Sequence, residues 1–396
     1  MGNPIDYKGV FNPVPLPKRI LLDLRCMRKG KNGPSRFSYE ILKKLIEVDN
    51  RNQYLVLAHP EWRGEFAFPP NIEAKFVSIN HTSILDSLWV FNIAHRFNAG
   101  IYLSTSFITP LFTGTRKRIA TLHDLINITL PEYFSGKNII YSSGARRYLR
   151  LRTWLTVKLS DYLLTVSKFS KEHIVNYFRL NANSVEIVYN GVNSIFSPKT
   201  MSEETRVRYG INRPYIMGLG NFRGYKNIGR LLQAFAILKD KGCDEILVLC
   251  GKFSLDMAQK IIRETVRKEI INSVILVNDL DDNQLREFYS SASVFVFPSL
   301  SEGFGIPPLE AMACGCYVVA SSAASIPEVC GDAAIYADPR NPFAFAEAIW
   351  QLLTQPELQA SLRKRGFRQA RKFQWEESAR QLIKILCSIE SEPAPQ

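Results

Sequence analysis

Glu302 and Glu310 lie eight residues apart, on either side of a short segment that contains two glycines, Gly303-Phe304-Gly305. The apolar residues 292–297 before them predict a buried strand, and Pro307 predicts a helix start, where the missing N–H of proline costs nothing. Free backbone N–H groups at a helix start bind phosphate, and glycines let the backbone approach a ligand closely. Carboxylates accept strong hydrogen bonds from hydroxyls. The pattern therefore predicts a ligand with both phosphate and hydroxyl groups, such as a nucleoside diphosphate joined to a sugar.

This segment, with the Glu-Ala-Met-Ala-Cys-Gly sequence that begins at Glu310, resembles the Glu-x7-Glu motif of the retaining GT-B glycosyltransferases of family 4. The resemblance implies that Glu302 contacts hydroxyls of the donor sugar and that Glu310 contacts the ribose. It also implies that sugar and phosphate are held by the backbone amides of Gly303, Phe304, Gly305 and Ile306. The alternative is a pair of solvent-exposed glutamates that flank an ordinary loop.

Arg223 and Lys226 lie in a loop after a predicted strand at 215–220, where they could clamp a pyrophosphate and neutralise the charge of a leaving group. They match the arginine and lysine of the family's Gly…Arg…Lys-Asn segment, which implies a catalytic role. Two exposed surface cations are the alternative. Three glycines in the same segment nearly spell a dinucleotide fingerprint, but the third is one position late, which disfavours a nicotinamide site.

His123 follows a predicted strand at 118–122, in a His-Asp-Leu context with Pro-Glu-Tyr-Phe downstream that is typical of family 4. Ligands in parallel sheets bind beyond the carboxyl ends of the strands, so His123 is expected to face the cleft and to act in catalysis. A structural histidine is the alternative. Gly33, in a basic loop after the first predicted strand, is assigned to donor binding, although the family usually has two glycines there. Arg36 beside it could equally be an ordinary surface residue.

Asp279 and Asp281 spell Asp-x-Asp, the metal-binding signature of the other common glycosyltransferase fold. Aspartates also favour the first turn of a helix, so we expect these residues to cap the helix at 284–290, and we assign no metal site. In the resembled fold this loop lies near the nucleobase, which makes Leu280 a candidate for base contact. We expect no cofactor, only the nucleotide sugar as co-substrate.

The chain has 396 residues, which is too long for one ordinary core, and predicted strands alternate with helical stretches. This alternation predicts α/β domains with parallel sheets. The resemblance implies the GT-B fold, in which two Rossmann-like domains face a cleft. We place the acceptor domain at 1–192 and the donor domain at 193–374, with a polar linker at 193–212. A last amphipathic helix at about 375–390 is expected to pack back on the first domain.

The net charge of +13 is uneven: residues 1–192 hold 26 Lys and Arg against 14 Asp and Glu, whereas residues 193–396 hold 24 against 23. The basic half indicates an anionic partner, either nucleic acid or an anionic membrane.

Much of this basic character lies in a predicted helix at 144–159. Residues at helical spacing form one apolar stripe, which consists of Tyr148, Leu151, Leu155, Leu159 and Tyr162. The other faces carry the cations Arg146, Arg147, Arg150, Arg152 and Lys158. The helix could face an anionic membrane surface, or it could be a core helix with a solvated outer face.

No run of apolar residues approaches the 18 that a membrane-spanning helix needs, and the N-terminal residues lack a signal-peptide core. The seven cysteines include no Cys-x-x-Cys pair, which is typical of reduced cytosolic thiols. We therefore expect a cytoplasmic protein that could lie peripherally at the inner face of the membrane.

Together with the resemblance, these features predict an enzyme that transfers a hexose from a nucleotide diphosphate sugar with retained anomeric configuration. UDP-glucose is the first choice of donor because it is the commonest, and GDP-mannose is the second. The expected acceptor is a hydroxyl of a growing polysaccharide or glycoconjugate, which could be lipid-linked. Two alternatives are a GT-B nucleotide-sugar epimerase, which needs no acceptor, and a basic nucleic-acid-binding protein, which the lack of a recognised binding motif disfavours.

Overall fold

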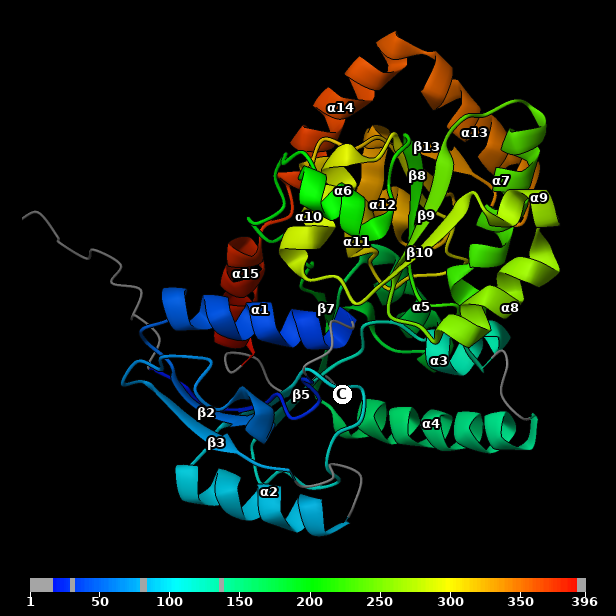
Figure 1. The fold of residues 1–396 in the computed structure, drawn as a ribbon. Helices are drawn as coiled ribbons and strands as arrows, with labels where there is room; N and C mark the ends of the chain where they lie inside the picture. The colour runs from blue at the N-terminus through cyan, green and yellow to red at the C-terminus, as the bar shows by residue number, and fades with distance from the viewer. Residues whose placement is uncertain (1–16, 29–32, 79–83, 135–138, 390–396) are drawn as a thin grey trace, which may run out of the picture.

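The computed structural model describes residues 17–28, 33–78, 84–134 and 139–389. Two parallel β-sheets, each covered by helices, form the two halves of the molecule (Figure 1). The alternation of strands and helices predicted from the sequence therefore produces two α/β units.

The first sheet has seven strands in the order β3-β2-β1-β4-β5-β6-β7, all parallel to their neighbours. The central strands are apolar and buried, as expected of a sheet covered on both faces. The strands are β1 (Arg19–Asp23), β2 (Gln53–Ala58), β3 (Ile72–Phe76), β4 (Ile101–Ser104), β5 (Lys117–Thr121), β6 (Tyr162–Thr165) and β7 (Val185–Ile187).

The helices of the first half connect these strands. They are α1 (Gly33–Val48), α2 (Ile84–Phe97), α3 (Ile126–Thr129), α4 (Ile139–Leu159) and α5 (Lys168–Phe178), with short 3-10 helices η1 (Pro60–Trp62), η2 (Pro131–Phe134) and η3 (Ala182–Ser184). Ser167 caps α5 by accepting a hydrogen bond from the Ser170 amide.

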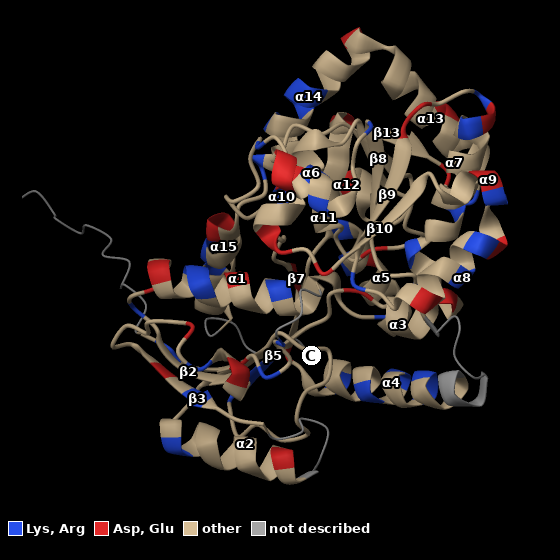
Figure 2. Ribbon diagram, viewed as in Figure 1, with Lys and Arg blue, Asp and Glu red and all other residues tan. Residues whose placement is uncertain are grey.

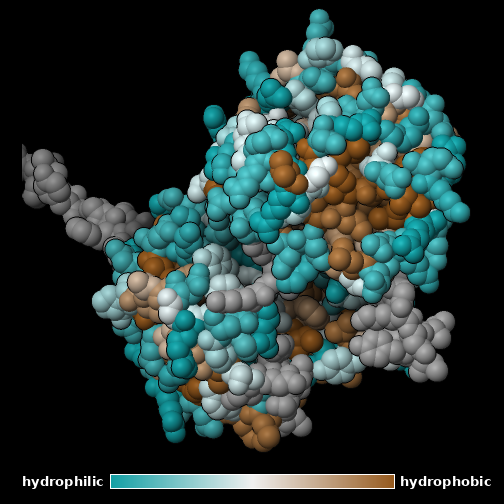
Figure 3. Space-filling view, in the orientation of Figure 1, coloured by the Kyte–Doolittle hydropathy of each residue, from teal (hydrophilic) through white to brown (hydrophobic). Residues whose placement is uncertain are grey.

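The second sheet has six strands in the order β10-β9-β8-β11-β12-β13, again all parallel. The strands are β8 (Tyr215–Leu219), β9 (Ile246–Gly251), β10 (Val274–Asn278), β11 (Val294–Phe297), β12 (Val318–Ser321) and β13 (Ile335–Ala337). At the edge of this sheet, Val274, Ile275 and Leu276 of β10 are half-buried, and apolar surface gathers on this side of the second half (Figure 3).

The helices of the second half are α6 (Glu203–Tyr209), α7 (Ile228–Asp240), α8 (Leu255–Thr265), α9 (Lys268–Ile271), α10 (Asp282–Ser291), α11 (Ile306–Ala313), α12 (Ile326–Cys330), α13 (Pro342–Thr354), α14 (Pro356–Ala370) and α15 (Trp375–Ser388), with η4 (Gly224–Lys226) and η5 (Gly331–Ala333). The segment 193–212, expected to be a polar linker, contains α6. Ser202 caps this short helix and Gly210 ends it in the left-handed conformation, a signal that the sequence did carry.

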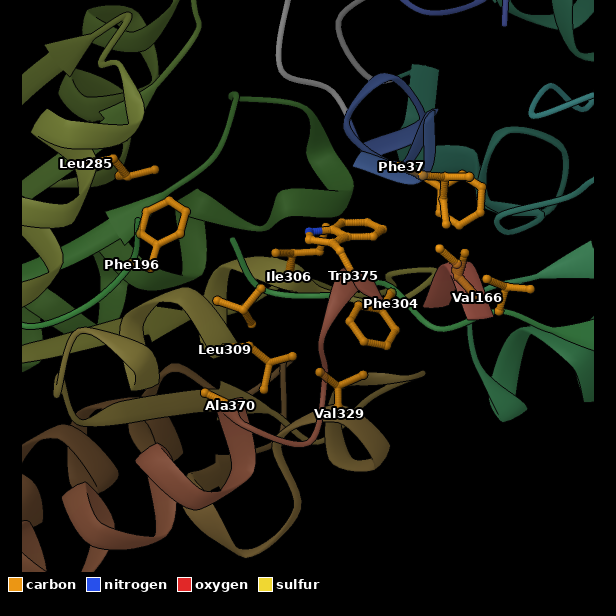
Figure 4. Close-up of a cluster of buried hydrophobic side chains, with 14 of the residues drawn as sticks. Phe37, Val166, Phe196, Leu285, Phe304, Ile306, Leu309, Val329, Ala370 and Trp375 are labelled. Atoms are coloured by element: carbon orange, nitrogen blue, oxygen red, sulfur yellow. The ribbon is translucent and has the colours of Figure 1, made fainter. Parts of the chain in front are cut away.

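The two halves are joined by one continuous apolar core. Figure 4 shows Phe37 and Val166 from the first half in the same cluster as Phe304 from the second and Trp375 from α15. Helix α15 packs against α1, and the Nζ of Lys18 donates a 2.6 Å hydrogen bond to the carbonyl of Leu386. Helix α15 therefore lies on the first half, although it follows the second in sequence.

The strand order locates the place where a ligand is expected in each half. In both sheets the order reverses beside the first strand, between β1 and β4 and between β8 and β11. Open α/β sheets bind ligands in the crevice beyond the carboxyl ends of the strands at such a switch point. The loops that follow β8 and β11 carry Arg223, Lys226 and the segment 302–310, so the second switch point is built from the residues singled out in the sequence.

Candidate active site

The loop between β11 and α11 needs its two glycines for different reasons. Gly305 is the N-cap of α11 and has a φ of 91°, a left-handed conformation that strains other residues. A Cβ on Gly303 would lie only 2.7 Å from the carbonyl oxygen of His123 in the first half. The predicted strand, loop and helix are thus in place, and the loop lies directly against the neighbouring domain.

Glu302 forms an ion pair with Lys226 on the loop after β8. The Nζ of Lys226 lies 2.8 Å from Oε1 of Glu302, and both side chains are largely buried. Burial alone would lower the pKa of Lys226, but the adjacent carboxylate of Glu302 more than compensates, so this pKa is raised. A fixed positive charge therefore lies beside Glu302 at the switch point of the second sheet.

Glu310 forms an ion pair with Arg36, which comes from the first turn of α1. Nη1 of Arg36 lies 2.9 Å from Oε1 of Glu310, and their side chains are 13% and 2% exposed. Tyr289 donates a 3.3 Å hydrogen bond to Oε2 of Glu310, and Asp282 lies 3.8 Å from Arg36. Arg36 is therefore a buried link between the two halves, and the interpretation of an ordinary surface arginine is wrong.

His123 is buried at the carboxyl end of β5, against the same loop. Its Nε2 lies 3.2 Å from the carbonyl oxygen of Thr105, so this nitrogen carries the proton and donates. The ring also meets Phe37 edge-on, with centroids 5.1 Å apart. Burial lowers the pKa of His123 to about 4, and the imidazole is therefore neutral near pH 7.

Asp124 is a second titratable group at this contact. Its pKa is raised to about 6; burial is the main cause and nearby Glu302 adds to it, while the Ile126 amide and Lys226 act in the opposite direction. A carboxyl with a pKa near neutrality beside a sugar-binding candidate is typical of functional sites, although structural ion pairs can produce the same shift. Sequence inspection did not single out Asp124, because its burial and its proximity to Glu302 and Lys226 arise only in the folded chain.

Arg223 is exposed and lies over a tyrosine of the first half. Its guanidinium carbon is 5.1 Å from the ring centre of Tyr133, which in turn stacks on Tyr225 with centroids 5.9 Å apart. The loop after β8 therefore contacts η2 of the first half. Lys226 points to Glu302, whereas Arg223 points to the opposite domain.

Gly33 and Leu280 lie at other positions around the site. Gly33 begins α1, and the space where its Cβ would lie is open, so a ligand could approach the backbone there. Leu280 is half-buried and packs against the main core. Asp281 caps α10 in a capping box with Gln284, which confirms the predicted cap, and exposed Asp279 lies 3.6 Å from Lys252. Within the described ranges, no group of three or more His, Cys, Asp or Glu side chains is arranged to hold a metal ion.

Two serines of the first half hold the loop between β11 and α11. The hydroxyls of Ser167 and Ser170, at the start of α5, donate to the carbonyl of Gly303 at 2.7 and 3.1 Å. Ser325 also donates at 2.9 Å to the carbonyls of both Glu302 and Phe304. Ser167 thus serves both as the cap of α5 and as a donor to a loop 136 residues away in the sequence.

Glu328 forms another link between the halves. Its carboxylate accepts hydrogen bonds from the amides of Lys168 and Phe169 at 2.8 and 3.1 Å and from the hydroxyl of Tyr189 at 3.0 Å. A carboxylate at the start of α5 suits the positive end of the helix dipole.

The cations of α4 do not share one environment. Figure 2 shows basic residues and no acidic ones along the described part of this helix. Arg150 donates two hydrogen bonds to the carbonyl of Ile128, Arg152 donates one to the carbonyl of Thr109, and Arg146 is half-buried. Only Arg147 of the four predicted arginines is exposed and has no recorded partner among the described residues. No described helix is both long and apolar enough to cross a bilayer.

Comparison with known proteins places this geometry in a family. The sequence model described as glycosyl transferases group 1 matches residues 201–369, and the model described as glycosyltransferase family 4 matches residues 32–196. O-antigen chain mannosyltransferase B of Escherichia coli is 31% identical over 289 residues, which cover 72% of this chain and 73% of that protein. O-antigen chain mannosyltransferase RfbU of Salmonella typhimurium is 27% identical over 350 residues, or 85% of this chain and 92% of that protein.

The fold is also similar to a solved structure. Sucrose-phosphate synthase from Thermosynechococcus elongatus superposes with a TM-score of 0.71 at 17% identity, over 94% of this chain and 99% of that structure. The predicted arrangement of two Rossmann-like domains is confirmed.

Proposed function

Because the chain belongs to the glycosyl transferases group 1 family and is a hexosyltransferase, we propose that it transfers mannose from GDP-mannose to a hydroxyl of a growing polysaccharide. The observation that carries the proposal is the segment from Glu302 to Glu310 at the switch point of the second sheet. It combines a helix start for phosphate with two carboxylates for hydroxyls.

In this proposal the donor lies between the β11–α11 loop and the first half. Glu302 contacts hydroxyls of the donor sugar, and Glu310 contacts the ribose. The amides of Gly303, Phe304, Gly305 and Ile306 hold the sugar and the phosphates, Gly33 lies on the opposite side, and Leu280 contacts the base. Neutral His123 contributes a polar contact to the sugar.

Stabilisation of the departing diphosphate accounts for most of the proposed rate enhancement. The start of α11 and the fixed charge of Lys226 lie at the position where negative charge develops. Arg223 reaches the diphosphate when it leaves the ring of Tyr133. These groups provide positive charge without a metal ion. Retention of anomeric configuration is part of the proposal and rests on the family alone.

GDP-mannose replaces UDP-glucose as the preferred donor, because the curated relatives quoted above are named mannosyltransferases. A panel of nucleotide sugars tests this choice. The purified protein should be stabilised against thermal unfolding by GDP-mannose more than by UDP-glucose, UDP-galactose or UDP-N-acetylglucosamine. Stronger stabilisation by any of the UDP sugars would contradict the choice of donor.

The same panel separates transfer from epimerisation. A transferase forms a glycosylated product only when an acceptor glycan is present, whereas an epimerase changes the sugar of the donor without one. Products formed with and without acceptor should therefore be compared by mass spectrometry and NMR. A new nucleotide sugar in the absence of acceptor would favour the epimerase.

A lipid-linked acceptor and a peripheral position at a membrane are also part of the proposal. The relatives are named for O-antigen chains, and the first half carries most of the net positive charge. The exposed residues of α4 that support this position are Arg147, Arg150, Trp154 and Lys158, whereas Arg146 and Arg152 are mainly structural. Co-sedimentation with anionic vesicles that weakens as salt is added is the expected result. Equal sedimentation with zwitterionic vesicles would contradict it.

A further inference from the structure

A cavity of about 370 Å³ lies in the first half, between the last turns of α4 and the end of α5. Its lining includes three cations and three aromatic residues: Arg150, Trp154, Lys158, Tyr177, Phe178 and Arg179. None of the lining residues is acidic. The cavity shares no residue with the candidate active site.

The three cations dominate the electrostatics of this cavity. Both helices end beside it, and each helix end contributes about half of a negative charge, which is less in total than the three full positive charges. Arg150 is partly engaged with the carbonyl of Ile128, but Lys158 and Arg179 are exposed and have no recorded ion-pair partner in the described part of the chain. The cavity therefore attracts an anion.

Helix α4 presents apolar residues to solvent beside this cavity. Leu151 is 56% exposed and Trp154 is 47% exposed, whereas Thr153 and Thr156 are buried. A core helix would bury its apolar stripe. In α4 the stripe instead lies partly in solvent, since its members Tyr148 and Leu159 are exposed as well. Exposed apolar and aromatic side chains next to cations are typical of helices that lie in a membrane interface.

We propose that this cavity binds the phosphate head group of an anionic lipid. Lys158 and Arg179 contact the phosphate, while Trp154 and Leu151 enter the layer of acyl chains beside it. The inference deepens the proposed membrane position by naming a specific lipid site, but it does not depend on which nucleotide sugar the enzyme uses.

The site is remote from the donor. Helix α5 has 11 residues, which span about 16 Å, and it runs from Ser167 and Ser170 at the β11–α11 loop to Tyr177 and Arg179 at the cavity. A lipid bound here anchors the first half without occupying the place of the acceptor hydroxyl.

Binding of dihexanoyl phosphatidic acid, kept below its critical micelle concentration, tests the proposal by isothermal titration calorimetry. The pocket variant combines Lys158→Gln with Arg179→Gln. The control variant combines Arg116→Gln with Arg147→Gln, which removes the same charge from exposed positions outside the cavity. All four side chains are exposed and form no ion pair or hydrogen bond with other residues that the structure describes, so both variants should fold, as circular dichroism would verify.

We expect one lipid per wild-type chain, a loss of about 30-fold in affinity for the pocket variant, and a change of less than about twofold for the control. Dihexanoyl phosphatidylcholine and inorganic phosphate should bind much more weakly than the anionic lipid. Equal losses in both variants would show a diffuse electrostatic attraction and overturn the site. Inorganic phosphate binding as tightly as the lipid, or no saturable binding at all, would overturn the assignment to a lipid.

The experiment also separates this inference from the proposed enzymatic function, because it measures lipid binding without donor. Mannosyl transfer with a water-soluble acceptor should be unchanged in the pocket variant, since neither residue contacts the β11–α11 loop. Loss of transfer to the water-soluble acceptor in the pocket variant would contradict this separation and place the cavity in the catalytic machinery.

Discussion

Arg36 of α1 and Glu310 of α11 form a 2.9 Å ion pair that joins the two halves across the proposed donor site. Glu310 is also the residue proposed to bind the ribose. In the proposed complex, the ribose hydroxyls and the guanidinium of Arg36 contact the same carboxylate. The ion pair therefore links the two halves at the proposed ribose site.

Substitution of Arg36 by glutamine is expected to destabilise the protein without donor. Removal of one partner from a buried ion pair costs on the order of 3 kcal/mol, which corresponds to a decrease of about 3–4 °C in the melting temperature for a chain of this size. Differential scanning calorimetry measures the change, with Arg51→Gln, an exposed site, as the control. A melting temperature of Arg36→Gln that equals that of the control would contradict the role of the pair.

Lys226→Met is expected to lower kcat by about 100-fold or more, because it removes fixed positive charge where the leaving diphosphate develops negative charge. Lys252→Met removes a similar charge from an exposed position beside Asp279 and serves as the control. Steady-state kinetics with varied GDP-mannose compares the two. Equal kcat values for both variants would remove Lys226 from the catalytic machinery.

Asp124→Asn tests the titration of the buried carboxyl. Its pKa of about 6 in the folded protein lies above the ordinary value of 3.8, so the folded state binds a proton more tightly than the unfolded state between about pH 4 and 6. Wild-type stability therefore falls through this range as pH rises, and the variant lacks this contribution.

The measurement is the difference in the free energy of urea unfolding between Asp124→Asn and wild type at several pH values. From pH 4 to 7 the free energy of unfolding of the variant should rise, relative to that of wild type, by on the order of 2–3 kcal/mol. Above pH 7 the difference should stay constant. The opposite pH dependence of His123 is present in both proteins and cancels. A difference that does not change with pH would show that Asp124 has an ordinary pKa.

Chelation is expected to leave transfer intact, because Lys226 and the start of α11 provide the positive charge. Initial rates should agree within about twofold before and after dialysis against EDTA. Asp279→Ala should likewise retain activity, since this residue is exposed and paired with Lys252. Loss of turnover in EDTA that manganese or magnesium restores would return the Asp-x-Asp sequence to the catalytic site.

The sequence predicted those parts of the candidate site that depend on residues close together in the chain. The apolar run of β11, the left-handed Gly305 and the prolines of α11 dictate the strand, loop and helix that position Glu302 and Glu310. The cap at Asp281 was predictable for the same reason, because the hydrogen bonds involve residues three positions apart.

Contacts between the halves could not be predicted in this way. Arg36 and Glu310 are distant in sequence, and nothing near Arg36 indicates a carboxylate partner. The sequence also did not determine which face of α4 points to solvent. The arginines of α4 bond to the carbonyls of Ile128 and Thr109 in other segments, and this arrangement turns Leu151 and Trp154 outward. Periodicity identifies an apolar stripe but does not tell which environment the stripe faces.

The most direct test of the central claim is the steady-state kinetics of Glu310→Ala and Glu302→Ala with varied GDP-mannose, alongside exposed Glu357→Ala as the control. Loss of charged hydrogen bonds to the ribose should raise KM for the donor by about 10- to 100-fold in Glu310→Ala. Glu302→Ala should chiefly lower kcat, since its bonds to the sugar tighten as charge develops in the transition state. Kinetics of both variants that match those of Glu357→Ala would show that the segment from Glu302 to Glu310 does not hold the donor.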